Sequence, residues 1–129
     1  RNKSHQRRIL ATANNARRQI QDKKQREVFD KLVELVNANL TDQQFSVDHL
    51  CLELGMNRTK LYSFIKSTTG MSLGNYIRKI RLDKAAELLR TTDMSISEVG
   101  YAVGIESPSY FTRTFKEQFG SSPSEFIKH

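Results

Sequence analysis

The sequence predicts an all-α protein in which two helix-turn-helix subdomains lie in tandem and are joined by a long bridging helix. Three observations lead to this prediction. Apolar residues recur at intervals of three and four along most of the chain, which is the period of an amphipathic helix. A short helix, a glycine turn and a second helix occur twice. Between the two copies lies one longer helix whose apolar stripe changes sides.

Length and charge limit the class of protein. A chain of 129 residues suits one domain, or two very small ones that share an element. Residues 1–26 hold nine Lys or Arg and one Asp, whereas residues 27–129 hold twelve Lys or Arg and thirteen Asp or Glu. The stretch from Asn57 to Arg81 contains six basic residues and no acidic one, which predicts a positive patch for a polyanionic partner. The alternative is an ordinary solvated helix face.

The N-terminal part of the chain divides near residue 25. Residues 1–24 are polar and basic with only a thin apolar stripe, so we expect a linker or a marginal helix there. A firmer amphipathic pattern runs from Glu27 to Leu40. It predicts a helix at the start of a domain that extends over residues 25–129.

The first helix-turn-helix unit is predicted between Ser46 and Gly70. Ser46 can cap a short helix that Gly55 ends. Asn57 can cap the second helix, which closes at Gly70. Cys51 falls on the apolar face of the short helix, so we expect a core side chain there rather than a reactive thiol.

The bridging helix is predicted from Ser72 to about Arg90. Its first half places Leu73, Tyr76, Ile77 and Ile80 on one side, and its second half places Leu82, Ala85, Ala86 and Leu89 on roughly the opposite side. A helix with this pattern must pack against two different groups of helices. We therefore expect it to contact both helix-turn-helix units.

The second unit is predicted between Ser95 and Gly120. Ser95 can cap a short helix that Gly104 stops. Ser107 and Pro108 can begin the next helix, since proline is favoured at a first helical position. A last helical turn follows Gly120. Two copies of such a repeat are too few for a solenoid, so a pair of DNA-binding motifs is the better interpretation.

Two stretches carry a resemblance to a known family. Residues 103–116, VGIESPSYFTRTFK, resemble the signature of the AraC/XylS family, and so does GSSPSEFI over residues 120–127. The resemblance covers about residues 28–129. Three positions depart from the family pattern: Ile105 stands where an aromatic residue is usual, Gly100 where alanine is usual, and Ser63 where the first recognition helix often carries arginine.

The resemblance implies two recognition helices, over residues 57–68 and 107–118, that enter successive major grooves on one face of DNA. A bridge of about 19 residues spans about 28 Å, close to the ~34 Å helical turn that separates such grooves. The candidate DNA contacts are Arg58, Thr59, Lys60, Tyr62, Ser63 and Lys66 on the first helix and Ser107, Pro108, Ser109, Thr112, Arg113 and Lys116 on the second.

These residues divide by chemistry. Thr59, Tyr62 and Ser63 match base-reading positions of the family, whereas the basic residues around them, Arg58, Lys60 and Lys66, suit phosphates. Arg113 can donate two hydrogen bonds to a guanine edge, and Thr112 can pack its methyl group on thymine. A phosphate contact is the alternative for Arg113.

No enzyme activity, cofactor or metal site is expected. The single cysteine and the three histidines show no ligand spacing, and neither a phosphate-binding glycine loop nor a nucleophile with a placed base is present in the sequence. The expected partner is double-stranded DNA. The alternative function is a helical protein-interaction adaptor whose basic arm docks an acidic partner or RNA.

One stretch of the sequence resembles proteins that carry further domains upstream. Residues 45–70 resemble the C-terminal output domains of hybrid two-component regulators, in which kinase and receiver domains come first. Other family members carry a ligand-sensing barrel instead. Because the chain begins at Arg1 with no apolar leader or membrane span, we expect a cytoplasmic fragment of a larger bacterial regulator. Further expected partners are RNA polymerase, an upstream receiver or sensor domain, and a second copy through domains outside the chain.

Overall fold

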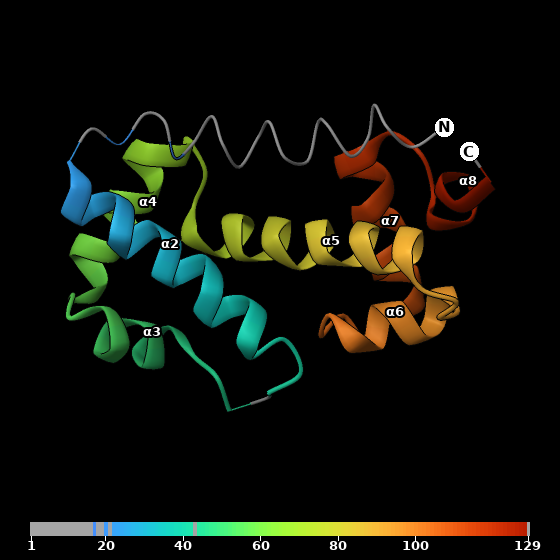
Figure 1. Cartoon of the computed structure of the whole chain (residues 1–129), viewed down its shortest axis with the longest axis horizontal. Coiled ribbons are helices and arrows are strands. Elements are labelled where there is room, and N and C mark those ends of the chain that lie inside the picture. Colours follow the sequence, from blue (N-terminus) through green and yellow to red (C-terminus); the bar gives the residue numbers. More distant parts are fainter. Residues whose placement is uncertain (1–16, 18–19, 21, 43, 129) are drawn as a thin grey trace.

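The computed structural model describes residues 17, 20, 22–42 and 44–128. These residues form seven helices and no strand, which confirms the all-α prediction. The helices are α2 (Lys23–Ala38), α3 (Val47–Leu54), α4 (Arg58–Thr69), α5 (Leu73–Thr91), α6 (Ile96–Ala102), α7 (Pro108–Phe119) and α8 (Pro123–Lys128). In Figure 1, α5 lies across the middle of the molecule, with α2, α3 and α4 at one end and α6, α7 and α8 at the other. None of these helices is long and apolar enough to cross a bilayer.

Serine and asparagine side chains cap the helices where the sequence predicts them. Ser46, Asn57, Ser72, Ser95 and Ser107 each accept a hydrogen bond from a backbone amide in the first turn of the following helix. In α6, the Glu98 carboxylate returns a second bond by accepting from the Ser95 amide at 2.8 Å. These local contacts fix where both helix-turn-helix units begin.

Helix α2 begins earlier than the predicted start near Glu27. Asp22 caps it by accepting from the amides of Lys24 and Gln25, so the helix starts at Lys23. Its first turn is wholly polar and therefore lacks the apolar spacing on which the prediction depended. Most of the predicted linker or marginal helix over residues 1–24 lies outside the described residues. Of that segment, Ile20 is buried in the first core.

Each helix-turn-helix unit has a core of its own. The first core consists of Ile20, Phe29, Leu32, Val36, Leu50, Leu61, Ile65, Leu73, Tyr76 and Ile80. The second consists of Leu82, Ala85, Ala86, Leu89, Val99, Val103, Ile105, Phe111, Phe115, Phe119 and Phe126. Cys51 is partly buried against the first core, so it lies on the apolar side where the sequence places it.

Helix α5 is the bridge that the change of stripe predicts. Its residues up to Ile80 belong to the first core and those from Leu82 onwards belong to the second. Only Ile77 of the predicted first stripe is partly rather than fully buried. Because each buried aliphatic side chain contributes about 1.5–3 kcal/mol, both ends of α5 are held firmly by their own unit.

A polar network fixes α7 against α5. The Asp83 carboxylate accepts hydrogen bonds from Lys79 Nζ at 2.8 Å and from Gln118 Nε2 at 2.7 Å. Burial raises the pKa of Asp83, and the bonds from Lys79 and Gln118 oppose this rise. Both side chains of the ion pair are largely buried, with 12% of Lys79 and 20% of Asp83 exposed. The network therefore orients the second helix of the second unit relative to the bridge.

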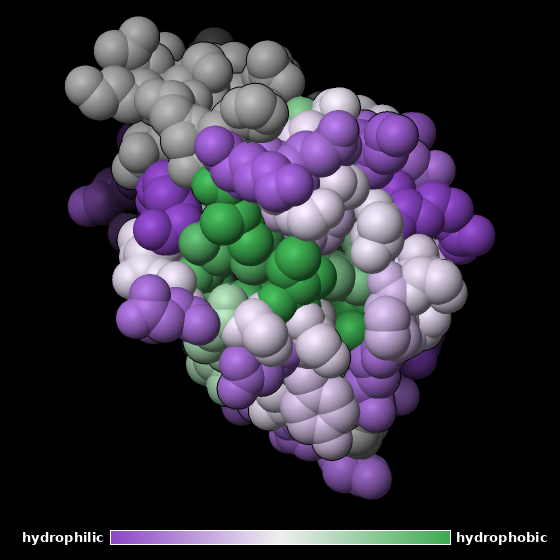
Figure 2. Space-filling view, turned by 90° about the vertical axis from the view of Figure 1, so that its right-hand side faces the viewer, coloured by the Kyte–Doolittle hydropathy of each residue, from purple (hydrophilic) through white to green (hydrophobic). Residues whose placement is uncertain are grey.

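The end of the molecule formed by the second unit carries an apolar area. Figure 2 looks at this end and shows apolar side chains gathered at its centre with polar side chains around them. In the second unit, Leu88, Met94 and Ile96 are only partly buried against the core, and Ile127 is 40% exposed.

Candidate nucleic-acid interface

The second helix of each unit, α4 and α7, leaves one face open to solvent. Leu61 and Ile65 anchor α4 in the first core, and Phe111 and Phe115 anchor α7 in the second. The twelve residues predicted to contact DNA are all exposed: Arg58, Thr59, Lys60, Tyr62, Ser63, Lys66, Ser107, Pro108, Ser109, Thr112, Arg113 and Lys116. The sequence pattern thus separates the buried and exposed faces of both helices correctly.

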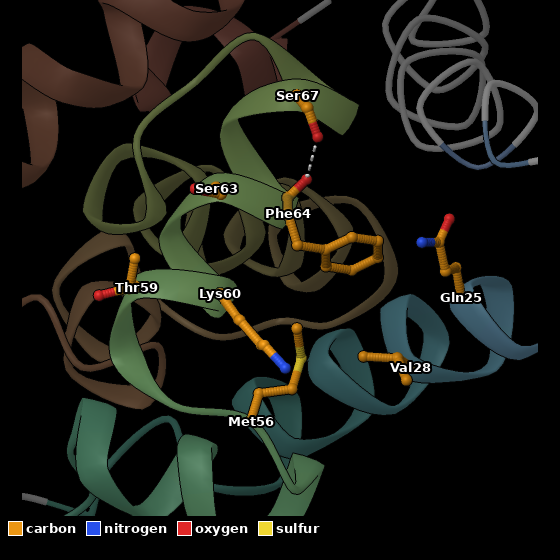
Figure 3. A pocket seen from close by; sticks show the side chains of 8 residues that line it. All are labelled: Gln25, Val28, Met56, Thr59, Lys60, Ser63, Phe64 and Ser67. Atoms are coloured by element: carbon orange, nitrogen blue, oxygen red, sulfur yellow. Dashed lines mark hydrogen bonds between the residues drawn. The ribbon is translucent and has the colours of Figure 1, made fainter.

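A pocket of about 480 Å³ lies between α4 and α2 beside the predicted base-reading residues. It is lined by Gln25, Val28, Met56, Thr59, Lys60, Ser63, Phe64 and Ser67. Figure 3 shows the Lys60 side chain extending towards Met56 and α2. The Lys60 ammonium group therefore lies at the edge of the α4 face, a position that suits a phosphate better than a base.

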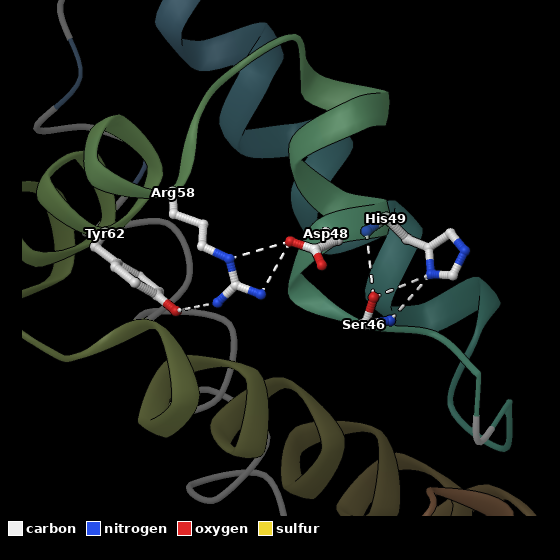
Figure 4. A network of polar contacts seen from close by, with 5 residues as sticks. All are labelled: Ser46, Asp48, His49, Arg58 and Tyr62. Atoms are coloured by element: carbon white, nitrogen blue, oxygen red, sulfur yellow. Dashed lines mark hydrogen bonds and ion pairs between the residues drawn. The ribbon is translucent and has the colours of Figure 1, made fainter.

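Arg58 takes part in a polar network that the sequence reasoning did not foresee. Its guanidinium donates to Asp48 Oδ1 on α3 from Nε at 3.0 Å, with Nη2 of the same group 2.9 Å from that oxygen. It also donates to the Tyr62 hydroxyl at 3.3 Å (Figure 4). Asp48 raises the pKa of Arg58, first through this hydrogen bond and then through its charge. The ion pair is solvent-exposed and therefore weak, so a phosphate can compete for Arg58.

Lys66 and Lys116 occupy equivalent positions near the ends of α4 and α7, but their contacts differ. Lys66 Nζ donates to the Gly70 carbonyl oxygen at 3.1 Å and so caps the last turn of α4. Lys116 lies in the last turn of α7 and is exposed. Both lysines belong to the last turn of their helix, where the helix dipole favours a cation.

Tyr110 connects the strongest candidate base contact to the bridging helix. The Arg113 guanidinium lies 5.3 Å from the centre of the Tyr110 ring, within the range of a cation–π contact. The Tyr110 hydroxyl accepts a hydrogen bond from Arg78 Nη1 at 3.0 Å, and Arg78 Nη2 donates to Asn75 Oδ1 at 3.2 Å. Arg113 is therefore packed on a ring that is itself held in place by α5.

A groove of about 620 Å³ lies between the two units, beside the start of α7. Its lining consists of Gly74, Asn75, Ile77, Arg78, Arg81, Gly104, Ile105, Glu106, Ser107 and Tyr110. Sequence reasoning missed Asn75 and Arg78 as candidate contacts because it considered only the two recognition helices. The acid-free stretch that contains Arg78 was the signal that could have found it.

The basic stretch from Asn57 to Arg81 does not act as one patch. Lys79 is paired with Asp83 in the contact between α5 and α7. Arg81 donates to two backbone carbonyls inside the molecule. Only the α4 cations and Arg78 remain near the exposed faces, so the charge available to an anion is smaller than the sequence count.

Gly100 and Ile105, which depart from the expected pattern, lie close together beneath the start of α7. A Cβ atom on Gly100 would lie 3.2 Å from the Ile105 carbonyl oxygen and 3.2 Å from the Phe111 ring. Both Gly100 and Ile105 are buried, and they line a pocket of about 240 Å³ together with Pro108 and Thr112. Both residues therefore lie on the buried side of α7, away from its exposed face.

The part of the chain that the structure describes contains no group of three His, Cys, Asp or Glu residues that could hold a metal ion. The geometry is that of a binding surface made of cations, hydroxyl groups and one stacked arginine.

Comparisons with known proteins find relatives that share this fold. The family model described as a helix-turn-helix domain matches residues 50–129. Histidine kinase P4 of Formosa agariphila is 37% identical over 100 residues, which make up 78% of this chain and 7% of the kinase. The chain spans between 29% and 41% of the length of five other curated relatives.

Two solved structures share the fold. The C-terminal domain of AraT, a response regulator from Geobacillus stearothermophilus, aligns with a TM-score of 0.66 and 27% identity over 78% of this chain and 84% of that one. The DNA-binding domain of the global transcriptional factor AdpA, solved in complex with a target DNA, aligns with a TM-score of 0.66 and 28% identity. That alignment covers 83% of this chain and 92% of the AdpA chain.

Proposed function

The chain belongs to the AraC/XylS family of helix-turn-helix transcription regulators, and we propose that it binds double-stranded DNA sequence-specifically as the output domain of a bacterial regulator. It is a DNA-binding domain and not an enzyme. The observation that carries the proposal is the pair of exposed faces on α4 and α7, each anchored in its own core on a shared bridge.

The proposed interface assigns different roles to its residues. Arg113, Thr112 and Ser109 read bases from α7, and Thr59, Tyr62 and Ser63 read bases from α4. Phosphates are bound by Arg58, Lys60, Lys66 and Lys116, and Ser107 and Pro108 place the start of α7 at the groove. We add Arg78 and Asn75 to the phosphate contacts, because they line the groove between the two units.

A titration with fluorescently labelled duplexes tests the function itself. A selection from random duplexes would first provide the preferred site. We expect the chain to bind that site about 10³-fold or more tightly than random DNA at physiological salt, which is typical of specific binding. A protein-interaction adaptor with a basic arm would bind every duplex alike. Equal affinity for both duplexes would therefore overturn the proposal in favour of that alternative.

Arg113 and Lys116 separate base reading from phosphate binding on one helix. Arg113→Ala should lower the binding free energy by roughly 1–3 kcal/mol on the preferred site and by little on random DNA, because the planar guanidinium of Arg113 can contact a guanine edge. Lys116→Ala should weaken binding to all duplexes about equally. It should also lower the slope of log affinity against log salt concentration by about 0.9, since Lys116 neutralises one phosphate. Binding selections and salt titrations on both variants measure this difference.

Lys60→Ala provides the comparison from α4 and should behave like Lys116→Ala. If Arg113→Ala keeps the original base preference at every position and lowers affinity everywhere, Arg113 is a phosphate contact. Specificity would then come from Thr112, Ser109 or α4.

The parent protein is proposed to be a hybrid two-component regulator, in which a phosphorelay controls DNA binding. The likeness to a histidine kinase and to the output domain of a response regulator supports this context. A family member with an upstream ligand-sensing domain is the alternative. The DNA affinity of the full-length parent, measured before and after phosphorylation with a small phosphodonor, should change only in the first case.

Further partners are proposed on the same basis. They are RNA polymerase, the upstream receiver or sensor domain, and a second copy held through domains outside this chain. The apolar area at the end of the second unit supports a protein contact there, because exposed apolar patches rimmed by polar residues mark interaction surfaces (Figure 2). A cytoplasmic, DNA-associated location follows from the proposed function.

A further inference from the structure

Arg81 joins the two helix-turn-helix units at the middle of the bridge. It lies between Ile80, the last residue of α5 in the first core, and Leu82, the first in the second core. A single nitrogen, Arg81 Nη1, donates to the Leu40 carbonyl oxygen at 2.7 Å and to the Val103 carbonyl oxygen at 2.8 Å. Leu40 follows α2 in the first unit and Val103 directly follows α6 in the second. One side chain therefore ties both units to the bridge.

The backbone at Gly104 packs closely against Arg81 and the Leu40 carbonyl oxygen. Gly104 adopts the left-handed conformation next to Val103, and a Cβ atom there would collide with Arg81 Nη1 and the Leu40 carbonyl oxygen. The Leu40 side chain packs against both cores. The segment after α2 and the turn after α6 thus meet directly at Arg81, which also lines the groove beside the start of α7.

The chemistry of the contact makes it strong. The Arg81 side chain is partly buried, and burial lowers the pKa of Arg81, but a guanidinium stays charged in proteins. Hydrogen bonds from a charged donor are roughly twice as strong as neutral ones. Removing the side chain would also leave two carbonyl groups without this donor. The contact therefore resists the bending of α5 that would otherwise let the two units move apart.

We propose that Arg81 is a specificity-determining residue that fixes the orientation of α4 relative to α7 and so sets the number of base pairs between the two half-sites. The inference rests on the proposed DNA-binding function. Recognition helices on one face of DNA must reach grooves about 34 Å apart. A change of one base pair between the half-sites moves the second groove and also rotates it. Rigid units would then discriminate between spacings, whereas loosely joined units would accept several.

The first test needs no DNA. Leu52 and Tyr101 are 80% and 65% exposed on α3 and α6, so cysteines can replace them as spin-label sites in a Cys51→Ala background. When Arg81 is unchanged, pulsed electron paramagnetic resonance should give one narrow distribution of distances between the two spin labels. Arg81→Met should broaden it at least about twofold, because both charge-assisted bonds are lost. An equally narrow distribution in Arg81→Met would overturn the proposal.

The second test measures spacing. The unchanged chain should lose about tenfold affinity or more when one base pair is inserted between the half-sites, since the duplex must be deformed to restore the fit. Arg81→Met should lose less than about threefold. If Arg81→Met binds with the original spacing preference, the inference is wrong. If the unchanged chain binds no preferred duplex, the proposed function fails, and the spin-label result still decides whether Arg81 holds the units together.

Two further variants keep the outcome clear. Arg90→Met makes the same substitution on α5 within the second unit, and it should leave both the distance distribution and the spacing preference unchanged. Circular dichroism checks that Arg81→Met remains helical. Should that variant fail to fold, Arg81→Gln takes its place, because its shorter, neutral amide cannot supply charge-assisted bonds to the two carbonyl oxygens. A distribution as narrow as that of the unchanged chain for Arg81→Gln would then count against the proposal.

Discussion

Replacing Gly104 by alanine is expected to destabilise the protein by roughly 3–4 kcal/mol, a cost near the upper end for single substitutions. Two effects add at this position. Its φ of +81° is a left-handed conformation, which costs a residue with a side chain about 1–2 kcal/mol. The added methyl group would also meet the Arg81 guanidinium and the backbone carbonyl of Leu40, and the carbonyl belongs to the other unit and cannot simply rotate away. Urea denaturation followed by circular dichroism measures the loss.

Gly120→Ala is the matched control for this substitution. Gly120 has the same φ of +81°, but nothing lies within 4 Å of the position that a Cβ atom would occupy. Only the conformational cost of about 1–2 kcal/mol should therefore apply. Equal losses in the two variants would show that the close approach at Gly104 contributes nothing to stability.

The second large effect is expected for Phe115→Ala, at about 3–5 kcal/mol. Phe115 is fully buried, and its ring centre lies 5.8 Å from that of Phe111, 4.6 Å from that of Phe119 and 5.3 Å from that of Phe126. Truncation would remove its ring from this aromatic cluster and leave a cavity, because the neighbouring rings belong to helices that α5 holds in place. Small domains are stable by only about 5–15 kcal/mol, so the second unit should lose much of its stability.

Thermal and urea unfolding would measure this loss against Ile127→Ala. Ile127 lies on α8 and is 40% exposed, so its truncation should change stability by less than about 0.5 kcal/mol. A cost for Phe115→Ala within about 1 kcal/mol of this control would mean that the aromatic cluster repacks around the missing ring. It would contradict the expectation that truncation leaves a cavity.

Most of the fold was predictable because its signals are local. Ser72 caps α5 through contacts within one turn of sequence, and the switch of stripe between Ile80 and Leu82 is visible in the order of residues alone. The exposed faces of α4 and α7 followed from the same periodicity. Such features depend on neighbours three or four positions away, and a single sequence displays those neighbours directly.

The contacts between distant segments could not be predicted in this way. Arg81 reaches Leu40 across 41 positions, and no pattern in the sequence relates the two. Its basic charge suggested a surface contact, but its surroundings make it internal. Arg58 likewise appeared free for DNA until the structure brought Asp48 beside it. Tyr110 accepts a hydrogen bond from Arg78, which lies 32 positions earlier in the chain. The direction of a long polar side chain depends on tertiary structure.

The length of α5 sets both the distance and the angle between the two units. Each residue added to the middle of α5 would turn the second unit by about 100° and move it by about 1.5 Å. Seven added residues would return the angle to within ~20° of its starting value and lengthen the span by about 10.5 Å, roughly three base-pair steps of ~3.4 Å. The first core ends at Ile80 and the second begins at Leu82, on either side of Arg81 in the sequence. Each inserted residue would therefore rotate and shift one whole unit relative to the other. Any evolutionary change in the length of this helix would change the position of α7 relative to α4 in discrete steps.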